Sequence, residues 1–551
     1  MPKPKITEAL DRLSSKTSIK NTIYMLSIII FFALILLPPI LGIIIKWGSI
    51  QDVFNQPELL SAALNAVAAS FAVAFFVSSI DVVAGVPTAW MITRGKSKWL
   101  NVLDTLSDIP FIVPTATLGY SLLLFWSEPQ GLSSLFGVSF ISPGWLLVVL
   151  LHFTFSFPVV VRTMVGALLD YKLEYEQAAR TLGAAPLTAD RTVTFPILKH
   201  SLIASFTLAF ARSLSETGAT MIVAGAFVHG PIFVKNHIGE SGALVFVSSI
   251  LIVLSSLIFV TIKLLGSRLK MPVRKVWPVT ERKLSSSIIA SSRNGITLLI
   301  FFIIVLIPSL FVALPAFEAV FTGVLPKALG GLGVWADYWQ SITLSYSVGI
   351  VATLINIVVG LPMAIIIARR KVGKGPSTLL DTLVNIPIIV PSVALGASLA
   401  IFWKENFSFI PEIWLLIFAH LSITYPYFVR AMSAAIERIS IELEEAARTL
   451  GARPLGVFRT IIFPLTKYSM LSGAIMVFTR SVSETGATLV VSNLKTAPVL
   501  LARYWVIPYM ENPNTAPVTR AEIGLGCGFL ILLSFITLLV LRLVTRGKEG
   551  Y

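Results

Sequence analysis

Charged side chains lie inside two apolar stretches of this sequence, and they occur in the same pattern in both. The two groups are Arg212, Glu216 and Thr217, and Arg480, Glu484 and Thr485. A spacing of four residues puts two side chains on one face of a helix, so each arginine can pair with its glutamate. Ionisable groups inside a membrane helix usually face the bundle interior or a water-filled path. The pattern therefore indicates either gate or pathway elements for a solute, or internal ion pairs that order the bundle.

The sequence has no group of residues spaced like the catalytic centre of an enzyme. It contains no paired nucleophile and base, and no His, Cys, Asp and Glu cluster has metal-ligand spacing. The only Gly-Lys-Ser, at 95–97, lacks the upstream glycine of a phosphate-binding loop. We therefore expect no catalytic residues, no metal and no cofactor in this chain. His152 and His420 are expected to be hydrogen-bonded core histidines.

A short polar loop also occurs twice. Residues 177–183 (QAARTLG) return 268 residues later as 445–451 (EAARTLG), and each copy is followed by Phe-Pro. The glycine that ends each copy suits a helix C-terminus, so each loop predicts a short helix, a turn and a return to an apolar run. Such a pair suggests docking sites for a partner with two equivalent surfaces. The residues assigned to these sites are Glu176, Gln177, Ala178, Ala179, Gly183 and Pro196, and Glu445, Ala446, Ala447, Gly451 and Pro464.

The composition predicts that lipid is the solvent for most of the chain. Of 551 residues, 55% are hydrophobic and only 13% are charged, and the mean hydropathy is +0.85. Soluble proteins carry about 25% charged residues. A backbone in lipid must satisfy its own hydrogen bonds, so we expect an all-α membrane protein. The net charge of +15 comes from short loops between apolar runs, which favours a topological cause over a nucleic-acid partner.

Twelve apolar runs are long enough to cross a bilayer. They lie near 23–46, 62–92, 105–126, 144–168, 198–226, 243–266, 295–316, 342–368, 383–403, 412–436, 468–490 and 522–544. Breaks or tilts are expected at Gly85-Val86-Pro87 and Gly360-Leu361-Pro362. Pro110, Pro114, Pro387 and Pro391 are expected to kink helices.

The runs form two repeats of six. We predict a first repeat at 1–266 with its polar loop at 169–197, a basic linker at 267–294, and a second repeat at 295–551 with its loop at 437–467. Since six is even, both repeats have the same orientation. Lys and Arg concentrate before the first run and in the linker, which predicts that both termini and both polar loops are cytoplasmic.

The polar loop resembles the EAA loop of ABC importer permeases. That motif reads Glu-Ala-Ala, three residues, Gly, nine residues, Ile, one residue, Leu-Pro. The second copy matches it at Glu445, Ala446, Ala447, Gly451, Ile461 and Pro464, with Phe463 in place of Leu. The first copy departs from it at Gln177, Val193 and Phe195.

The resemblance implies a fused, two-repeat permease with the type I importer fold. Each loop would form a coupling helix in a groove of one of two separate ABC ATPase subunits, which would hold ATP and magnesium. An extracytoplasmic solute-binding protein would deliver the solute, and the chain would lie in the plasma or inner membrane.

The resemblance also narrows the solute class. Two halves in one chain are typical of ferric-iron and thiamine permeases. The Arg-Ser-x-Ser-Glu-Thr-Gly-Ala runs are similar to those of sulfate, molybdate and tungstate permeases. An inorganic ion, either ferric iron or an oxyanion, is therefore favoured over thiamine or a phosphonate. The alternative class is an ion-coupled secondary transporter in which Asp81, Glu216 and Glu484 carry protons. That class leaves the two matched loops unexplained.

Overall fold

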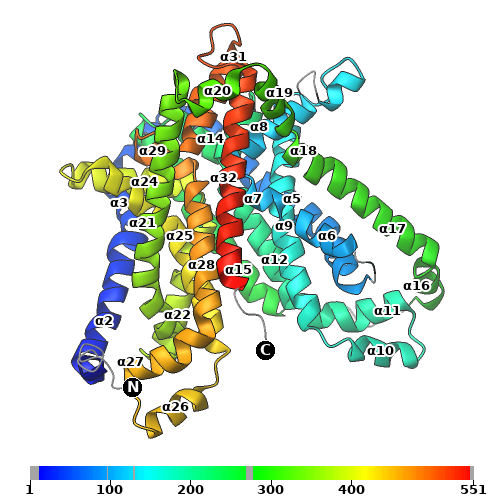
Figure 1. Ribbon diagram of the computed structural model, residues 1–551, viewed down its shortest axis with the longest axis vertical. Coiled ribbons are helices and arrows are strands. Elements are labelled where there is room, and N and C mark those ends of the chain that lie inside the picture. The colour runs from blue at the N-terminus through cyan, green and yellow to red at the C-terminus, as the bar shows by residue number, and fades with distance from the viewer. Residues whose placement is uncertain (1–10, 96, 98, 128–130, 269–276, 547–551) are drawn as a thin grey trace.

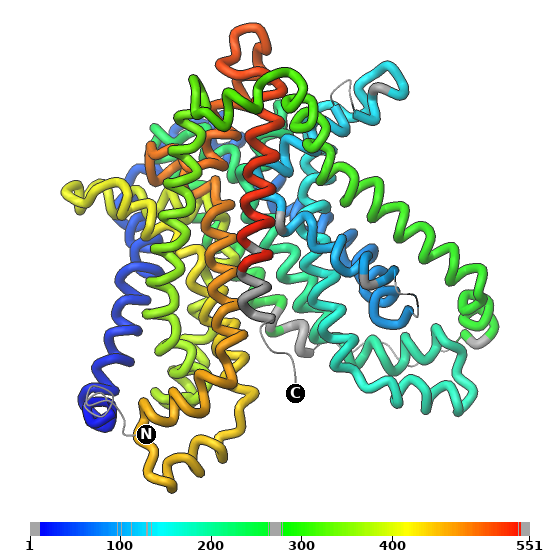
Figure 2. Tube along the Cα trace, in the orientation of Figure 1, coloured from blue at the N-terminus to red at the C-terminus, as the bar shows by residue number. Residues whose placement is uncertain are grey.

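The computed structural model describes residues 11–95, 97, 99–127, 131–268 and 277–546, and every regular element in this part of the chain is a helix (Figures 1 and 2). Ten helices or continuous helix runs within these residues are long and apolar enough to cross a membrane. The number rises to twelve if each of two bent helix pairs is one span. The predicted all-α membrane architecture with about twelve spans is therefore confirmed.

The first half of the chain begins with a long apolar helix and ends with another. Its elements are α2 (Thr17–Ile30), η1 (Phe31–Leu36), α3 (Leu37–Ile45), η2 (Trp47–Ile50), α4 (Gln51–Phe54), α5 (Pro57–Arg94), α6 (Trp99–Leu106), α7 (Ile109–Ile112), α8 (Thr115–Trp126), η3 (Leu132–Leu135), α9 (Trp145–Asp170), α10 (Glu174–Thr181), α11 (Pro186–Ala189), η4 (Asp190–Thr194), α12 (Phe195–Ser215), α13 (Gly218–Val223), α14 (Gly230–Asn236) and α15 (Ser241–Arg268).

The second half repeats most of this order. Its elements are α16 (Pro278–Leu284), α17 (Ser287–Ile300), η5 (Phe301–Leu306), α18 (Ile307–Leu310), α19 (Ala313–Phe321), α20 (Val324–Leu329), α21 (Val334–Ala368), α22 (Lys374–Leu383), α23 (Ile386–Ile389), α24 (Ser392–Asn406), α25 (Glu412–Glu437), α26 (Ile441–Thr449), α27 (Pro454–Val457), η6 (Phe458–Ile462), α28 (Phe463–Val482), α29 (Gly486–Val491), α30 (Ala497–Val499), η7 (Leu500–Val506), α31 (Ile507–Glu511) and α32 (Arg520–Arg546).

Three helices form the centre of each half, namely α5, α9 and α12 in the first and α21, α25 and α28 in the second. The breaks expected near Pro87 and Pro362 do not occur, because α5 and α21 run through both prolines. The neighbouring glycines serve close packing instead. A Cβ on Gly85 would lie 2.8 Å from Val160, and one on Gly360 would lie 2.8 Å from Phe428.

The helices expected at 105–126 and 383–403 are bent pairs rather than straight spans. The bends measure 105° before α8 and 103° before α24. Val113 and Val390 are extended there, because the proline that follows each of them disfavours helical geometry. This confirms the expected kink for Pro114 and Pro391, whereas Pro110 and Pro387 lie in the first turns of α7 and α23. Each bend turns the start of α8 or α24 toward the centre of the molecule.

The two halves are interlocked. The α2–α3 segment packs against α21, α24 and α25 of the second half, while α17 and α18 pack against α5 and α8 of the first (Figure 1). Ser27 donates a hydrogen bond of 2.8 Å to the carbonyl of Val359, and Ser121 donates one of 2.6 Å to that of Pro308. The sequence boundaries 1–266, 267–294 and 295–551 stay a prediction, but the first long helix of each half lies on the other half.

Candidate functional site

The two repeated polar loops form matching helices at one end of the bundle (Figure 1). We call this the loop end. Each helix stops at its glycine, because Gly183 has φ +92° and Gly451 has φ +87°, a conformation that favours glycine. The residue after each glycine closes the turn. Ala184 N–H donates to the carbonyl of Ala179 over 3.1 Å, and Ala452 N–H donates to the carbonyl of Ala447 over 2.9 Å. The predicted helix, glycine stop and turn are present in both copies.

Most of the motif side chains face outward. Gln177, Ala178, Glu445 and Ala446 are exposed, Ala179 and Ala447 are partly buried, and Pro196 and Pro464 lie in the first turns of α12 and α28. The leucine that caps each helix is almost fully exposed, with 90% of Leu182 and 89% of Leu450 accessible. A single exposed apolar side chain is common on protein surfaces, but here the exposure recurs at the same position in both copies.

Each loop is anchored by a glutamate one residue before the first position of the motif, which is Gln177 in the first copy and Glu445 in the second. Glu444 is buried and forms an ion pair of 2.8 Å with Arg369 at the end of α21. Arg369 also donates to the carbonyl of Ile439 over 2.9 Å. In the first copy, Glu176 lies 3.7 Å from Arg94 in a looser pair. Sequence reasoning missed both pairs, although Arg94 and Arg369 occupy matching places after the second run of each half.

The first loop is also held by the segment that precedes α17. Glu281 on α16 accepts hydrogen bonds from the Thr188 hydroxyl and from Arg191, whose guanidinium lies 2.7 Å away. The hydrogen bond from Thr188 is the largest cause that lowers the pKa of Glu281 below its ordinary value, and Arg191 adds to it. Ser285 accepts from Leu187 N–H over 3.1 Å. The second loop has a matching contact, since Ser14 accepts from Leu455 N–H over 3.2 Å.

The charged groups of the sequence lie where the two halves meet, but not on continuous helices as predicted. Helix α12 ends at Ser215, Glu216 is extended, and the chain resumes as α13. The second half breaks in the same place between α28 and α29. The spans expected at 198–226 and 468–490 are therefore interrupted. Each glutamate caps the new short helix: Glu216 Oε1 accepts from Ala219 N–H over 3.0 Å, and Glu484 matches it.

Only one of the two expected arginine–glutamate pairs forms. Arg480 lies 2.5 Å from Glu484. The guanidinium of Arg212 has no carboxylate of the described residues within 4.0 Å, and its carbon lies 5.3 Å from the ring centre of Phe155. The prediction of a second pair is wrong. Both helices end before the glutamate, so the spacing of an intact helix does not apply, and the carboxylate reaches the arginine only in the second half.

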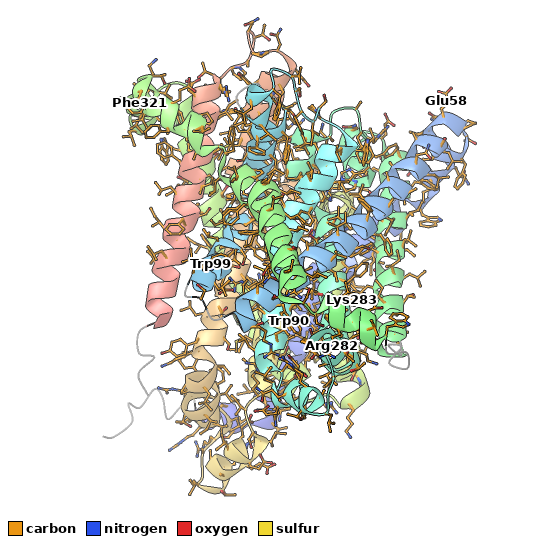
Figure 3. All side chains as sticks on the ribbon, turned by 90° about the vertical axis from the view of Figure 1, so that its right-hand side faces the viewer. Glu58, Trp90, Trp99, Arg282, Lys283 and Phe321 are labelled. Carbon is orange, nitrogen blue, oxygen red and sulfur yellow. The ribbon has the colours of Figure 1, made fainter. Side chains whose placement is uncertain are left out.

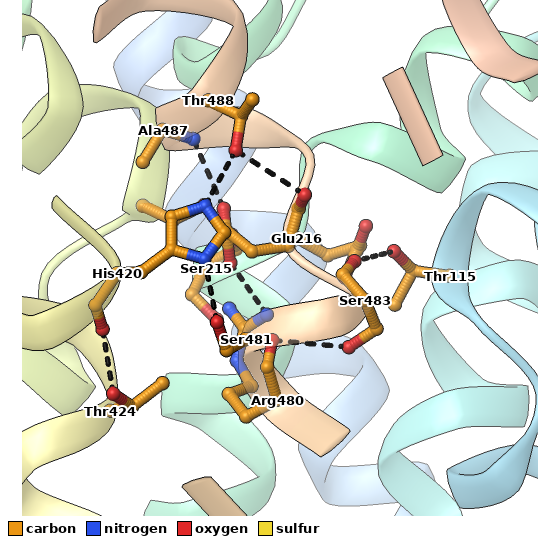
Figure 4. A network of polar contacts seen from close by, with 12 residues as sticks. Thr115, Ser215, Glu216, His420, Thr424, Arg480, Ser481, Ser483, Ala487 and Thr488 are labelled. Carbon is orange, nitrogen blue, oxygen red and sulfur yellow. Dashed lines mark hydrogen bonds and ion pairs between the residues drawn. The ribbon is translucent and has the colours of Figure 1, made fainter. Parts of the chain in front are cut away.

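Hydroxyl groups close the contact between the halves (Figure 4). Thr115 donates to the carbonyl of Ser483 over 3.3 Å, and Ser392 donates to that of Ser215 over the same distance. Thr217 and Thr485 are buried against the glycine of the other half. A Cβ on Gly218 would lie 2.5 Å from Cβ of Thr485, and one on Gly486 would lie 3.0 Å from Cβ of Thr217. We call Thr115, Ser215, Thr217, Ser392, Ser483 and Thr485 the hydroxyl clasp.

Two segments of the chain, residues 81–271 and 360–547, match the family described as binding-protein-dependent transport system inner membrane component. The chain belongs to this family. It is therefore a fused ABC importer permease, with the type I fold present twice, and a multi-pass inner-membrane transport subunit.

Individual relatives agree with this assignment. The sulfate transport system permease protein CysT of Salmonella typhimurium (strain LT2) is 33% identical over 255 residues, which cover 44% of this chain and 90% of that protein. The molybdenum transport system permease protein ModB of Escherichia coli (strain K12) is 31% identical over 232 residues, covering 38% of this chain and 96% of that protein. Each relative corresponds in length to about one half of the permease.

Two buried histidines support the broken helices of this permease. His152 binds the hydroxyls of Ser213 and Thr220 at 2.8 and 2.9 Å, and so bridges the break between α12 and α13. His420 bridges the second break with matching contacts of 2.7 and 2.9 Å. Both are hydrogen-bonded core histidines, as expected. Asp81 accepts a hydrogen bond from the Ser156 hydroxyl, which joins α5 to α9.

Proposed function

We propose that this permease is the membrane subunit of an ATP-driven, binding-protein-dependent importer of a tetrahedral oxyanion, such as sulfate or molybdate. The family supports the importer class, and the printed substrates of CysT and ModB support the oxyanion. Ferric iron, thiamine and a phosphonate become the less favoured substrates, because the relatives named above transport sulfate and molybdenum.

The observation that carries the coupling proposal is the pair of matched helices with exposed leucines at the loop end. In this proposal α10 and α26 each dock on one of two ABC ATPase subunits, which hold ATP and magnesium. Leu182 and Leu450 enter the apolar part of each contact, and the small side chains of Ala178 and Ala446 allow close approach. A solute-binding protein docks at the opposite end. The permease itself hydrolyses no ATP.

The fold supplies a route from these docking helices to the clasp. Helix α12 begins at Phe195, directly after the first loop, and ends at Ser215, whose carbonyl accepts the clasp hydrogen bond from Ser392. Helix α28 makes the same connection in the second half. When ATP draws the ATPase subunits together, the two loops move and α12 and α28 separate the clasp. Hydrolysis restores it, which gives alternating access with the clasp as the gate.

The proposed orientation places the loop end and both termini in the cytoplasm. Arg282 and Lys283 are exposed on α16 at the loop end, whereas Glu58 and Phe321 lie at the opposite end (Figure 3). Basic residues concentrate on the cytoplasmic side of membrane proteins. This orientation also puts the coupling helices in the compartment that contains ATP.

The test is uptake into liposomes that contain the permease, candidate ABC ATPase subunits and a candidate binding protein. We would measure labelled sulfate, molybdate, ferric iron and thiamine, with and without ATP. We expect uptake of one oxyanion that requires ATP and both partners. Uptake that follows a proton gradient and ignores both partners would instead favour the ion-coupled secondary transporter.

A further inference from the structure

The two central arginines are equivalent in sequence but not in structure. Arg480 is paired with Glu484, whereas Arg212 has neither a carboxylate within reach nor a hydrogen-bond partner for its buried Nε among the described residues. An unpaired cation inside a membrane bundle is costly, and such groups usually mark an ion path. Arg212 therefore holds a positive charge at the centre of the permease that no carboxylate of the described residues contacts in an ion pair.

Two unsatisfied hydroxyls lie in the clasp, each five residues after one of the central arginines in the sequence. Thr217 and Thr485 are 1% and 2% exposed, and neither hydroxyl has a hydrogen-bond partner among the described residues. Buried polar groups are normally paired, so these two are free to bond to a transient ligand. They come from opposite halves and each contacts the other half's glycine.

The neighbouring charges and helix ends fit an anion. The carboxylates of Glu216 and Glu484 accept hydrogen bonds from backbone N–H groups, and Glu484 also forms the ion pair with Arg480. Helices α8 and α24 begin at Thr115 and Ser392, so the positive ends of two longer helices also point at the clasp. A cation such as ferric iron would be repelled by the unpaired guanidinium and by the positive ends of the two helices.

We propose that Arg212 recognises the charge of a tetrahedral oxyanion as it crosses the membrane, while Thr217 and Thr485 donate hydrogen bonds to its oxygens. The first half thus supplies the charge of the path, and the Arg480–Glu484 pair of the second half is structural. When the clasp opens, the anion becomes the missing counter-ion of Arg212. This inference rests on the proposed function and adds the residues that give the path its selectivity.

The test uses the assembled transporter in liposomes, with labelled sulfate and molybdate as probes and saturating loaded binding protein. We expect Arg212→Gln to lower oxyanion uptake about tenfold or more, since a charge-assisted contact is lost, while ATP hydrolysis stimulated by the binding protein persists. Arg212→Lys, which keeps the charge, should retain more uptake than Gln. The double variant Thr217→Val, Thr485→Val should also lower uptake. Thr353→Val should not, because its hydroxyl bonds only within α21.

Thermal unfolding separates recognition from a structural role. Arg212→Gln removes an unpaired charge and should leave the Tm unchanged or raise it. Arg480→Gln leaves the buried carboxylate of Glu484 without its counter-ion and should lower the Tm. An Arg212→Gln permease that transports sulfate and molybdate like the wild type, or that loses as much Tm as Arg480→Gln, would overturn this inference alone. Wild-type vesicles without ATP-dependent oxyanion uptake would overturn the proposed function and this inference with it.

Discussion

At the scale of single residues, the departure of the first loop from the EAA motif has a simple reading. Gln177 and its counterpart Glu445 are both exposed, so the change removes no ion pair. The anchoring carboxylates are Glu176 and Glu444, one position earlier, and both copies keep them. Both loops can therefore be positioned in the same way despite the substitution.

Glu444→Gln should destabilise the permease, because it leaves Arg369 buried without its counter-ion. Breaking a buried pair costs about 3–5 kcal/mol in the free energy of unfolding. Thermal unfolding of the purified chain in detergent would measure the loss. Glu445→Gln, which recreates the first copy's residue on the surface, is the matched control and should change stability by less than about 0.5 kcal/mol. Equal effects of the two variants would contradict the assigned anchor.

The contact between α16 and the first loop should depend on pH. The pKa of Glu281 lies below its ordinary value of 4.5, so the folded state favours the ionised carboxylate. Its stabilisation is complete above that ordinary value and is lost as the pH falls through the lowered pKa. The protection of the amide hydrogens of residues 278–285, measured against their intrinsic exchange rate at each pH, should therefore fall only below pH 4.5. Glu281→Gln should remove this pH dependence, and an unchanged profile in that variant would assign the effect to another group.

At the scale of elements, the helices of the permease end or bend at specific residues near the loops and the clasp. Glycines with positive φ end α10 and α26, prolines bend the chain before α8 and α24, and the segments at the centre unwind between α12 and α13. Each interruption is balanced by local bonds, such as the glutamate that caps α13. A prediction of one straight helix for each apolar run misses these ends, because hydropathy does not show where the backbone hydrogen bonds of a helix are interrupted.

Gly451→Ala should loosen the last turn of α26 and uncouple transport. Its φ of +87° is strained for alanine by about 1 kcal/mol or more, although the space around a Cβ is open. We expect ATP hydrolysis to persist while uptake falls severalfold in the assembled liposomes. Gly456→Ala in α27, where φ is ordinary and the nearest atom lies 3.8 Å away, is the control. Full uptake by Gly451→Ala would show that this helix end is not part of the coupling.

At the scale of the whole molecule, the two halves form one interlocked body, and the clasp, which we propose as the gate, lies at their contact. The first long helix of each half lies on the other half, and α16 places part of the second half against the first loop. The clasp is one of the places where a glycine of one half lies directly against the other half; Gly42 against Ser398 is another. A movement that enters at α10 or α26 can therefore reach the clasp through a single helix on each side.

Gly218→Ala should hold the halves apart and open the gate. The added Cβ would lie 2.5 Å from Cβ of Thr485, an atom fixed by its backbone, so the clasp cannot close without a shift of α13 or α29. We expect vesicles preloaded with labelled sulfate to leak without ATP. Gly166→Ala on α9, where a Cβ meets open space, should stay tight. Tight vesicles with both variants would remove the clasp as the gate.

The sequence by itself determined the solvent, the helical class, the two repeats and the loop helices with their glycine stops. These features follow from composition, from periodic apolar runs and from residue types that act locally, such as glycine at a helix end. It also placed Arg212, Arg480 and their glutamates near the centre of each half.

Only the tertiary structure decided how these parts meet. The unequal arginines, the anchors Glu176 and Glu444, the clasp and the exchange of first helices join residues far apart in the chain, and sequence spacing carries no information on such contacts. Arg212 and Glu216 illustrate the physical reason. Four residues of separation predict a pair on an intact helix, but the helix ends before the glutamate in both halves, and the ion pair forms in only one of them.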